Sequence, residues 1–403
     1  MIFLRFLRTY RKPAKLEFFT TLLLILSTIL ALAVYNSPLR GIYKYIFDKT
    51  YIFSSFTLHT FINDFLMSIF FLVAGLEIKY EILHGNLSSL KKSSFPVLAS
   101  IGGVVVPALI FFHFNKNTPY LNGICIPIST DIAFAVGLFS IFRKKLNTSL
   151  KIFLLSLAIV DDLISIAAIG IIYSLDLNLD YFTIALIILC VLCIANLVFN
   201  VESITYYLIG GACLWYFIHL SGVHSTVSGI LLALAIPSKS TNYSLSTLER
   251  LQRVLVPINS LIVIPLFAFA NTGISLNYNL DFSKAPTLSL GIIVGLCVGK
   301  PLGIMLFSYI SCLLGIAEKP SYINWSSIFL VSLIAGVGFT MSIFISEIAF
   351  IRDAALINIA KMSILMSALI SLCSTSMAIL IYRFISKKYK GEYNHNSNKY
   401  RIS

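Results

Sequence analysis

The sequence predicts an all-α membrane protein with about twelve transmembrane helices that form inverted repeats. Three observations favour this class. Of the 403 residues, 58% are hydrophobic and only 12% are charged, whereas about a quarter of the residues are charged in a soluble domain. Apolar runs of about 20 residues, the length of helix that crosses a bilayer, recur along the whole chain. The polar segments between these runs carry the basic residues very unequally.

The apolar runs define the predicted spans and leave no room for a soluble domain. We expect one polytopic domain over residues 1–385, in which residues 1–16 form a cytoplasmic N-terminal segment. The tail at 386–403 is rich in Lys, Asn and Tyr and is predicted to be a disordered cytoplasmic end. The twelve predicted spans lie at roughly 17–36, 58–82, 95–114, 121–142, 150–174, 181–200, 204–221, 223–236, 255–275, 287–315, 326–350 and 355–385.

The distribution of basic residues predicts the orientation of the chain, whose net charge is +13. If the N-terminus is cytoplasmic, 22 of the 30 Lys and Arg residues fall on the inner side and six on the outer side, while Lys300 and Lys361 lie within spans. Cytoplasmic loops carry such an excess, so both termini are expected in the cytoplasm. The basic charge therefore reflects topology and does not indicate a nucleic-acid partner.

A few ionisable residues fall inside predicted spans, where an Asp or Lys at mid-bilayer costs about 2.5–3.5 kcal/mol on insertion scales. Asp64, Glu77 and Lys361 lie near span ends, where pairing at the interface and a functional role are equally good explanations. The others lie near the middle of their spans, too far from the interface for their charges to reach it: Asp131, Asp161, Asp162 and Lys300.

The adjacent carboxylates Asp161 and Asp162 in "LAIVDDLISI" need two different surroundings, because consecutive residues point about 100° apart around a helix. Lys300 is the only cation predicted near mid-membrane, and it can neutralise one of the two. At least one carboxylate is then left to bind a proton or an inorganic cation. If the cluster only held helices together, two buried carboxylates would have to stay permanently protonated.

Two spans contain features that interrupt a helix. In "NGICIPISTDIAFAVG", Pro127 lacks an amide hydrogen and clashes with the preceding turn, so the helix should break there. Ser129 and Thr130 can then supply the N-cap of the resumed helix. Asp131 falls in its first turn, where a negative charge suits the exposed amide groups.

The second interrupted span is predicted in "VSLIAGVGFTMSIFIS", where Gly336 and Gly338 weaken the helix and Thr340 offers a hydroxyl. Small residues also serve close helix packing. Spans 3–5 run opposite to spans 10–12, and the interrupted spans, 4 and 11, are the middle ones. Such paired broken helices mark a mid-membrane site in secondary transporters. If they cross, like dipole ends meet, and Asp131 and Lys300 have the signs to offset them.

One asymmetric charge cluster favours an ion carrier over a channel, which would need repeated rings of acids or carbonyls. Together the motifs resemble the NhaA family of bacterial sodium/proton antiporters over essentially residues 10–385. The resemblance implies a twelve-helix fold in which helices 4 and 11 are unwound and cross in mid-membrane. The motifs that carry it are "PISTDIAFAVG", "LAIVDDLISI", "GVHSTVSGILLALAIP", "IPLFAFANTGISL", "GKPLGI" and "GVGFTMSIFI".

The resemblance also assigns roles to the buried charges. It implies that Asp131 and Asp162 carry the proton and the ion, with Na+ bound at both and Thr130 beside them. Asp161 and Lys300 would form the neighbouring charge pair. No cofactor is needed, because protons and Na+ can compete for the same carboxylates. Two carboxylates can each release a proton when one cation arrives, so more than one proton can cross for each ion.

Family membership would make the protein an electrogenic antiporter of the bacterial inner membrane that exchanges cytoplasmic Na+ or Li+ for external H+. Members move their site between the two faces by alternating access and are activated at alkaline pH. Their first two helices are joined by an outer segment used in dimerisation, so a homodimer within the lipid bilayer is expected. Here that segment is "RGIYKYIFDKTYIFSSF", whose alternation is compatible with a hairpin.

Three positions bear on the response to pH. Glu77 and Glu81 in "GLEIKYEIL" resemble the family's pH-sensing entrance, although Tyr80 stands where a basic residue is usual. "LERLQRVLVP" likewise has Gln and Arg in place of an acid and a His. His224 in "GVHSTVSG" is a further titrating candidate, and a packing role for a lone His is an equally good explanation.

Other classes of function fit less well. An intramembrane aspartyl protease also uses two Asp residues, and "GVGF" resembles its glycine motif, but no Asp follows Gly338. A symporter of organic solutes would need a larger polar pocket, and no Arg lies at mid-membrane. An exchanger with another cation preference is the nearest alternative. The protein is therefore not expected to be an enzyme, and the Cys190 and Cys193 pair has no His or acidic neighbour to suggest a metal site.

Overall fold

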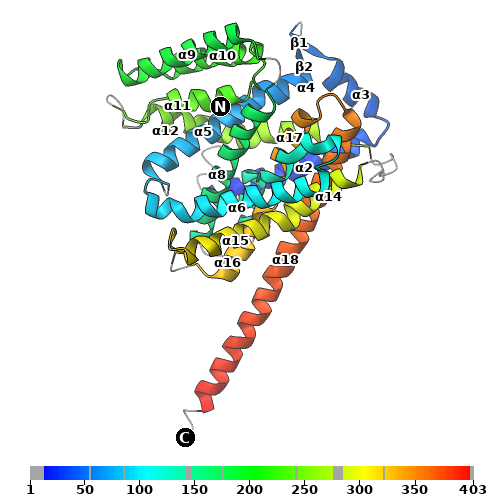
Figure 1. The fold of residues 1–403 in the computed structure, drawn as a ribbon, viewed down its shortest axis with the longest axis vertical. Coiled ribbons are helices and arrows are strands. Elements are labelled where there is room, and N and C mark those ends of the chain that lie inside the picture. The colour runs from blue at the N-terminus through cyan, green and yellow to red at the C-terminus, as the bar shows by residue number, and fades with distance from the viewer. Residues whose placement is uncertain are drawn as a thin grey trace.

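The fold of the protein is helical in this computed structural model, which describes residues 13–53, 56–85, 87–141, 148–174, 177–240, 244–275, 285–320 and 323–399. Within these ranges the regular elements are helices and one two-stranded sheet (Figure 1). Eight helices of this part are long and apolar enough to cross a membrane, or ten if each of two bent pairs is one span. An all-α membrane protein is therefore confirmed as the fold class.

The long apolar helices carry most of the chain, and several include a π-turn, labelled η. The bent pairs consist of the 3₁₀ helix η3 (Pro119–Ile128) with α7 (Ile132–Ile141), and of α16 (Trp325–Ala335) with α17 (Phe339–Ala349). The long helices are α2 (Pro13–Tyr35), α4–η2–α5 (Leu58–Phe61, Ile62–Leu66, Met67–His84), α6 (Leu90–Asn115), α8 (Thr148–Ile172), α9 (Leu179–Leu197), α12–η4–α13 (Thr247–Ile258, Asn259–Val263, Ile264–Asn271), α14–η5–α15 (Pro286–Val294, Gly295–Gly299, Lys300–Leu313) and α18 (Ala354–Lys399).

The predicted spans agree with these helices to within about five residues, apart from the end of the twelfth, where α18 continues to Lys399, and the start of the ninth. Its helix begins at Thr247, where the sequence predicted 255. The reason is local, because Ser246 and Glu249 form a complete capping box ahead of the apolar run. The seventh and eighth predicted spans correspond to α10 (Ile204–Leu220) and α11 (Val227–Ala235), which are shorter than any other span when each bent pair is taken as one span.

Close helix contacts occur at glycines, which have no side chain to keep the helices apart. α6 packs along α15, and a Cβ added to Gly102 would meet the carbonyl oxygen of Gly303. α11 packs along α5, where a Cβ added to Gly75 would come 2.7 Å from the Cβ of Ala233. Small residues allow such approach between membrane helices. In Figure 1, α9 and α10 lie side by side at one edge of the molecule.

The distribution of apolar side chains fits a helical bundle surrounded by lipid. The largest buried cluster draws on α5, α13, α14, α17 and α18 and includes Phe71, Phe267 and Phe344. The outer helices also present large apolar side chains outward: Ile187 on α9 is 57% exposed and Ile209 on α10 is 63% exposed. Exposed apolar stripes on helices of this length are expected where hydrocarbon replaces water as the solvent.

The segment between the first two long helices contains α3 (Arg40–Lys44), the π-turn η1 (Tyr45–Lys49) and an antiparallel pair, β1 (Tyr51–Phe53) and β2 (Phe56–Thr57). The predicted hairpin is thus confirmed, with its turn outside the described residues. Tyr43 anchors the segment, because its hydroxyl is 2.6 Å from the carbonyl oxygen of Phe269 and 2.8 Å from that of Ala270. Burial raises the pKa of Tyr43, so the hydroxyl stays protonated and available as a donor.

Helix α18 projects well beyond the other helices in Figure 1. Its backbone continues as a helix to Lys399, through most of the tail at 386–403 that the sequence predicts to be disordered. Residues 400–403 and the N-terminal residues 1–12 lie outside the described part of the chain. The disorder of the tail and the cytoplasmic position of both termini stay predictions.

Candidate ion-binding site

The breaks in the two bent helix pairs meet inside the protein. η3 and α7 are bent by 43° across residues 129–131, and α16 and α17 are bent by 45° across residues 336–338. The Asp131 amide donates to the carbonyl oxygen of Val337 (2.9 Å), and the Ser342 hydroxyl donates to that of Ile126 (2.7 Å). Each break therefore supplies hydrogen-bond partners for backbone groups that the other leaves free, as irregular backbone at membrane depth requires.

The first break follows the proline chemistry that the sequence indicates. Pro127 lies in the last turn of η3, and Ser129 after it is extended (φ −84°, ψ 152°). The expectation that Ser129 and Thr130 cap the resumed helix is wrong. Asp131 is the cap, because its Oδ1 accepts a hydrogen bond from the Phe134 amide (2.9 Å). Its carboxylate competes better for an amide than the two hydroxyls do, and these point to other partners.

The second break depends on two glycines. Gly336 ends α16, and a Cβ added there would come 2.8 Å from the carbonyl oxygen of Leu296. Gly338 precedes α17, and a Cβ added there would come 2.9 Å from the carbonyl oxygen of Ser129. Neither position has room for a side chain. The sequence allowed two explanations for these glycines, helix interruption and close helix packing. The structure shows both, since the glycines end the helix and allow close approach.

Asp131 joins the starts of two helices. Its Oδ2 accepts hydrogen bonds from the amide of Thr340 (3.0 Å) and from the hydroxyl of the same residue (2.5 Å), which lies in the first turn of α17. Its Oδ1 caps α7. The positive dipole ends of α7 and α17 thus share one buried negative charge, which is the arrangement that the signs of the charges predicted.

Lys300 lies where the backbone presents partial negative charge, at the carbonyl end of η3. Its Nζ is 2.6 Å from Asp161 Oδ2 and donates to the carbonyl oxygen of Ile128 (2.6 Å), at the end of η3. Thr130 Oγ1 is also 2.6 Å from Asp161 Oδ2, and the hydroxyl of Ser100 donates to Oδ1 (3.2 Å). Asp161 and Lys300 are both fully buried. The structure therefore pairs Lys300 with Asp161, and hydroxyls complete the shell of that carboxylate.

A π-turn helps to position Lys300. η5 (Gly295–Gly299) immediately precedes it, and a Cβ added to Gly295 would come 2.8 Å from the Cβ of Pro127. The absence of a side chain at Gly295 therefore lets this helix approach the first break. Single π-turns often occur at functional sites of helices.

Asp162 is the carboxylate without partners. It is fully buried, and neither of its oxygens has a hydrogen-bond partner among the residues that the structure describes. The charged groups close enough to act on it are Asp161, Asp131, Lys300 and Glu77, of which three are acidic. A buried carboxylate in this position must bind a proton or a cation, because an isolated negative charge is very costly away from water.

Of the residues proposed for pH sensing, His224 lies apart from Glu77 and Glu81, which are one turn apart on α5. His224 precedes α11, with its Nδ1 2.8 Å from Thr226 Oγ1, and this end of α11 lies beside the start of α5. Glu77 and Glu81 lie in the second half of α5, and Glu77 acts electrostatically on both Glu81 and Asp162. Of the three, Glu77 is therefore the one that the structure links to the buried cluster.

Sequence reasoning missed several partners of the buried charges. Ser100 was not singled out, because a lone serine in an apolar span carries no local signal. Two of the three ionisable residues near span ends have a partner of opposite type: His219 Nδ1 is 3.8 Å from Asp64 Oδ2, and Lys361 forms an ion pair with Glu347. These contacts agree with pairing, one of the two explanations that the sequence left open, and the position of the pairs at the membrane interface stays a prediction.

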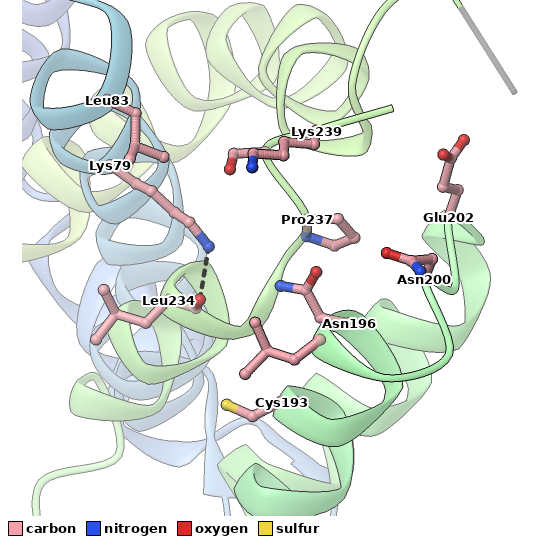
Figure 2. Close-up of a pocket in the computed structure, with 11 residues that line it drawn as sticks. Lys79, Leu83, Cys193, Asn196, Asn200, Glu202, Leu234, Pro237 and Lys239 are labelled. Atoms are coloured by element: carbon pink, nitrogen blue, oxygen red, sulfur yellow. Dashed lines mark hydrogen bonds between the residues drawn. The ribbon is translucent and has the colours of Figure 1, made fainter. Parts of the chain in front are cut away.

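A separate pocket of about 430 Å³ lies between α5, α9 and the end of α11. Figure 2 shows the ammonium of Lys79 directed toward Leu234, and Lys79 Nζ donates to the carbonyl oxygens of Leu234 (2.6 Å) and Ile236 (2.5 Å). Asn196 donates to the carbonyl oxygen of Ala235 (2.8 Å). These groups satisfy the carboxyl end of α11, so the pocket has a structural explanation. Over the described residues, no group of three or more His, Cys, Asp or Glu side chains could hold a metal ion.

Comparison with known proteins identifies close relatives over nearly the whole chain. The family model described as Na+/H+ antiporter 1 matches residues 11–380. The Na(+)/H(+) antiporter NhaA of Helicobacter pylori strain J99 is 40% identical over 411 residues, covering 90% of this chain and 93% of the relative. Na(+)/H(+) antiporter NhaA of Pelagibacter ubique strain HTCC1062 is 39% identical over 95% of this chain and 100% of the relative. Na(+)/H(+) antiporter NhaA 2 of Aliarcobacter butzleri strain RM4018 is 39% identical over 91% and 95%.

Proposed function

The chain belongs to the NhaA family of Na+/H+ antiporters, and from this premise we propose that it exchanges Na+ for H+ across the bacterial inner membrane. Membership makes it a transporter and not an enzyme. We infer that exchange arises because the two ions compete for the carboxylate of Asp162. When one ion is bound the other is excluded, so each ion can cross only if it replaces the other.

The observation that carries this proposal is the difference between the three buried aspartates. Asp161 is neutralised by Lys300, and Asp131 accepts hydrogen bonds from two helix starts. Asp162 is equally buried, but its oxygens have no hydrogen-bond partner in the described chain. A proton or a dehydrated Na+ supplies what this carboxylate lacks, and hard cations prefer oxygen ligands.

Asp131 is proposed to support ion binding beside Asp162. Its charge acts on Asp162, and it holds α7 and α17 together through Phe134 and Thr340. Direct binding of Na+ by Asp131, with Thr130 at its side, stays a prediction. Both Asp131 oxygens already accept hydrogen bonds, which favours the supporting role.

We propose that twelve helices cross the membrane in inverted repeats, with spans 4 and 11 interrupted. Eight long helices and two bent pairs account for ten spans, and α10 and α11 provide the remaining two. The bends at 129–131 and 336–338 support the assignment of the interrupted spans. Their mutual hydrogen bonds support a crossing at mid-membrane, near the ion site.

Transport is proposed to proceed by alternating access, in which the helices around the two breaks expose Asp162 to one side and then the other. An empty, charged site is costly to move, so reorientation follows binding of either ion. We propose that more than one proton crosses for each Na+, which makes the exchange electrogenic, and that Li+ replaces Na+. The observed excess of buried acids over buried cations around Asp162 supports this proton coupling.

The remaining family features are proposals for this chain. Both termini are cytoplasmic, as the distribution of basic residues indicates. Two copies associate in the lipid bilayer through the segment that contains β1 and β2. Alkaline activation involves Glu77 and Glu81 at the entrance, with His224 as a further titrating group.

Exchange can be tested in everted membrane vesicles that contain the protein. Addition of Na+ should collapse a preformed proton gradient, because inward-moving Na+ drives protons out through the antiporter. Asp162→Asn should abolish the response to Na+ and to Li+, since an amide cannot release a proton or neutralise the cation. The readout is the recovery of fluorescence of a proton-gradient dye after addition of each salt.

Two controls make the result specific. Choline chloride should leave the gradient intact in the same vesicles, and the Asp162→Asn protein should be present in the membrane at the wild-type level. A sodium response that persists in the Asp162→Asn variant would remove this carboxylate from the exchange. No sodium response in the wild type would contradict the proposed function as a whole.

A further inference from the structure

Ser165 is a second polar side chain near Asp162 without a hydrogen-bond partner. It is fully buried in α8, and its Oγ makes no hydrogen bond to the residues that the structure describes. Ser165 has no part in the exchange argued above. A buried hydroxyl is normally satisfied by a neighbour, so an unsatisfied one calls for an explanation.

The position of Ser165 on α8 places it over the aspartate pair. It follows Asp162 by three residues and Asp161 by four, and residues at these spacings are neighbours on one face of a helix. With 100° per residue, its direction falls between those of the two aspartates, one turn further along. Both Asp161 oxygens are occupied by Lys300, Thr130 and Ser100. The Asp162 carboxylate and the Ser165 hydroxyl are the groups left free on this face.

No hydrogen bond joins the two groups in the structure. Oxygens that share a cation stand further apart than oxygens that share a hydrogen, since the cation lies between them. Four other buried hydroxyls of the described chain also lack partners. Ser289, Ser308 and Thr375 lie on other helices, without an aspartate one turn away, and Ser225 lies just before α11, outside the cluster of Asp131, Asp161 and Asp162. Ser165 therefore combines the missing partner with the neighbouring carboxylate.

We propose that the Ser165 hydroxyl is a ligand of the transported cation, which it holds together with the Asp162 carboxylate. The proposal rests on the proposed exchange at Asp162 and adds a neutral oxygen to that site. In the proton-loaded state the same hydroxyl accepts a hydrogen bond from protonated Asp162 or stays free. In the cation-loaded state its lone pair faces the ion.

A neutral ligand changes the balance between the two ions. A proton is held by one carboxylate oxygen, whereas Na+ needs several oxygens to replace its hydration shell. Removal of the hydroxyl therefore weakens Na+ binding much more than proton binding. Ser165 is on this basis a specificity-determining residue, which favours the cation without adding charge to a region that already contains Asp131, Asp161, Asp162 and Glu77.

The proposal is tested by the sodium dependence of exchange in proteoliposomes at several pH values. Ser165→Ala should raise the Na+ concentration for half-maximal rate by about tenfold, which corresponds to ~1.4 kcal/mol of binding free energy. The maximal rate should stay close to that of the wild type. Ser165→Thr should restore sodium affinity, because threonine keeps the hydroxyl. The pH dependence at saturating Na+ should be the same for Ser165→Ala and the wild type.

Ser308→Ala is the matched control, because Ser308 is also fully buried without a hydrogen-bond partner but follows Lys300 by eight residues on α15. It should leave the sodium affinity unchanged. If Ser165→Ala also leaves the sodium affinity unchanged, or lowers only the maximal rate, the ligand role is wrong. A sodium shift that vanishes at alkaline pH would instead assign Ser165 to the proton affinity of Asp162 and would also overturn the ligand role.

Sodium binding by itself separates this inference from the proposed function. In thermal unfolding of the purified protein, Na+ should raise the Tm of the wild type and raise that of Ser165→Ala only at higher concentration. Asp162→Asn should lose the effect of Na+ entirely. If Asp162→Asn still responds to Na+, the proposed function fails. If Asp162→Asn loses the response to Na+ but Ser165→Ala responds like the wild type, exchange at Asp162 is supported and the ligand role of Ser165 is contradicted.

Discussion

Three aspartates of the same chemical type have three different surroundings within the crossing region. Asp161 has an ion pair with Lys300, and Asp131 has backbone and hydroxyl donors, whereas Asp162 has neither. Removing a group from a satisfied network leaves its partners buried and unsatisfied. Removing a charge that has no partner costs no such contact. The contribution of each carboxylate to stability should therefore differ even where all three matter for transport.

At the residue scale, we predict that Asp131→Asn lowers the Tm and Asp162→Asn does not. The amide in Asp131→Asn turns at least one N–H group toward the amides of Phe134 or Thr340, which costs about 1–3 kcal/mol for an unsatisfied buried donor. Asp162→Asn loses no hydrogen bond to the described chain and removes an unpaired acid. Unfolding should be followed in detergent without Na+, by the fluorescence of the two tryptophans.

The order of the two variants is the informative result. A Tm for Asp162→Asn at or above that of the wild type, with Asp131→Asn below both, agrees with the structure. The reverse order would mean that Asp162 has a stabilising partner in the folded protein. Asp161→Asn serves as a reference, because it leaves the buried Lys300 without its counter-charge and should also lower the Tm.

At the scale of elements, the two breaks show that an interrupted helix needs a partner as well as a local cause. Pro96 and Pro107 lie inside the continuous helix α6, and Pro257 lies inside α12. Pro127 alone of these four is followed by a break, and there the backbone is met by α17 and by Lys300. Proline weakens a helix at each position, but only a neighbour with matching groups lets the chain leave the helix.

We predict that Gly338→Ala disrupts the crossing and reduces exchange by more than tenfold. The added Cβ would come 2.9 Å from the carbonyl oxygen of Ser129 and 3.1 Å from a methyl of Leu296, so α17 must shift. Overpacking of this kind costs about 1–3 kcal/mol and separates Thr340 from Asp131. The measurement is sodium-driven proton efflux in vesicles, normalised to the amount of protein.

Gly41→Ala is the matched control for this substitution. Gly41 lies in α3, and an added Cβ there has nothing within 4 Å. This variant should fold and exchange ions like the wild type. Wild-type exchange by Gly338→Ala would show that the crossing tolerates a side chain at this point, contrary to the contacts described above.

At the scale of the whole molecule, the charge of the loops predicts the orientation, and the helix contacts determine the packing. The excess of Lys and Arg lies in the two ends and the even-numbered connections of the twelve predicted spans, which predicts that these segments are cytoplasmic. Between the helices, glycines at Gly102, Gly303 and Gly75 allow close contact where hydrocarbon gives no hydrophobic driving force. Orientation and packing thus depend on different residues.

We predict that a cysteine introduced by Lys49→Cys is labelled from outside the cell and one introduced by Lys239→Cys is not. Both lysines are exposed in the structure, and the charge distribution places them on opposite sides of the membrane. The seven native cysteines have to be replaced first. Reaction with a membrane-impermeant maleimide in intact cells should label only Lys49→Cys, and everted vesicles should give the opposite result. Equal labelling of both from one side would contradict the twelve-span topology.

The sequence by itself determined the membrane class, most helix boundaries and the identity of the buried charges. These depend on signals that lie within one segment: the length of an apolar run, the chemistry of Pro127 and the cost of a charge in hydrocarbon. The same signals also indicated that Asp161 and Asp162 need different surroundings. The motifs went further, because their combination identified the family.

Only the tertiary structure decided which group satisfies which. The Thr340 hydroxyl and the Asp131 carboxylate are 209 residues apart in the chain, and Ser100 is 61 residues from Asp161. Contacts over such separations depend on the packing of several helices, and no local pattern encodes them. For the same reason, the sequence showed two adjacent acids at 161 and 162, whereas the fold satisfied Asp161 and left Asp162 and Ser165 without hydrogen-bond partners in the described chain.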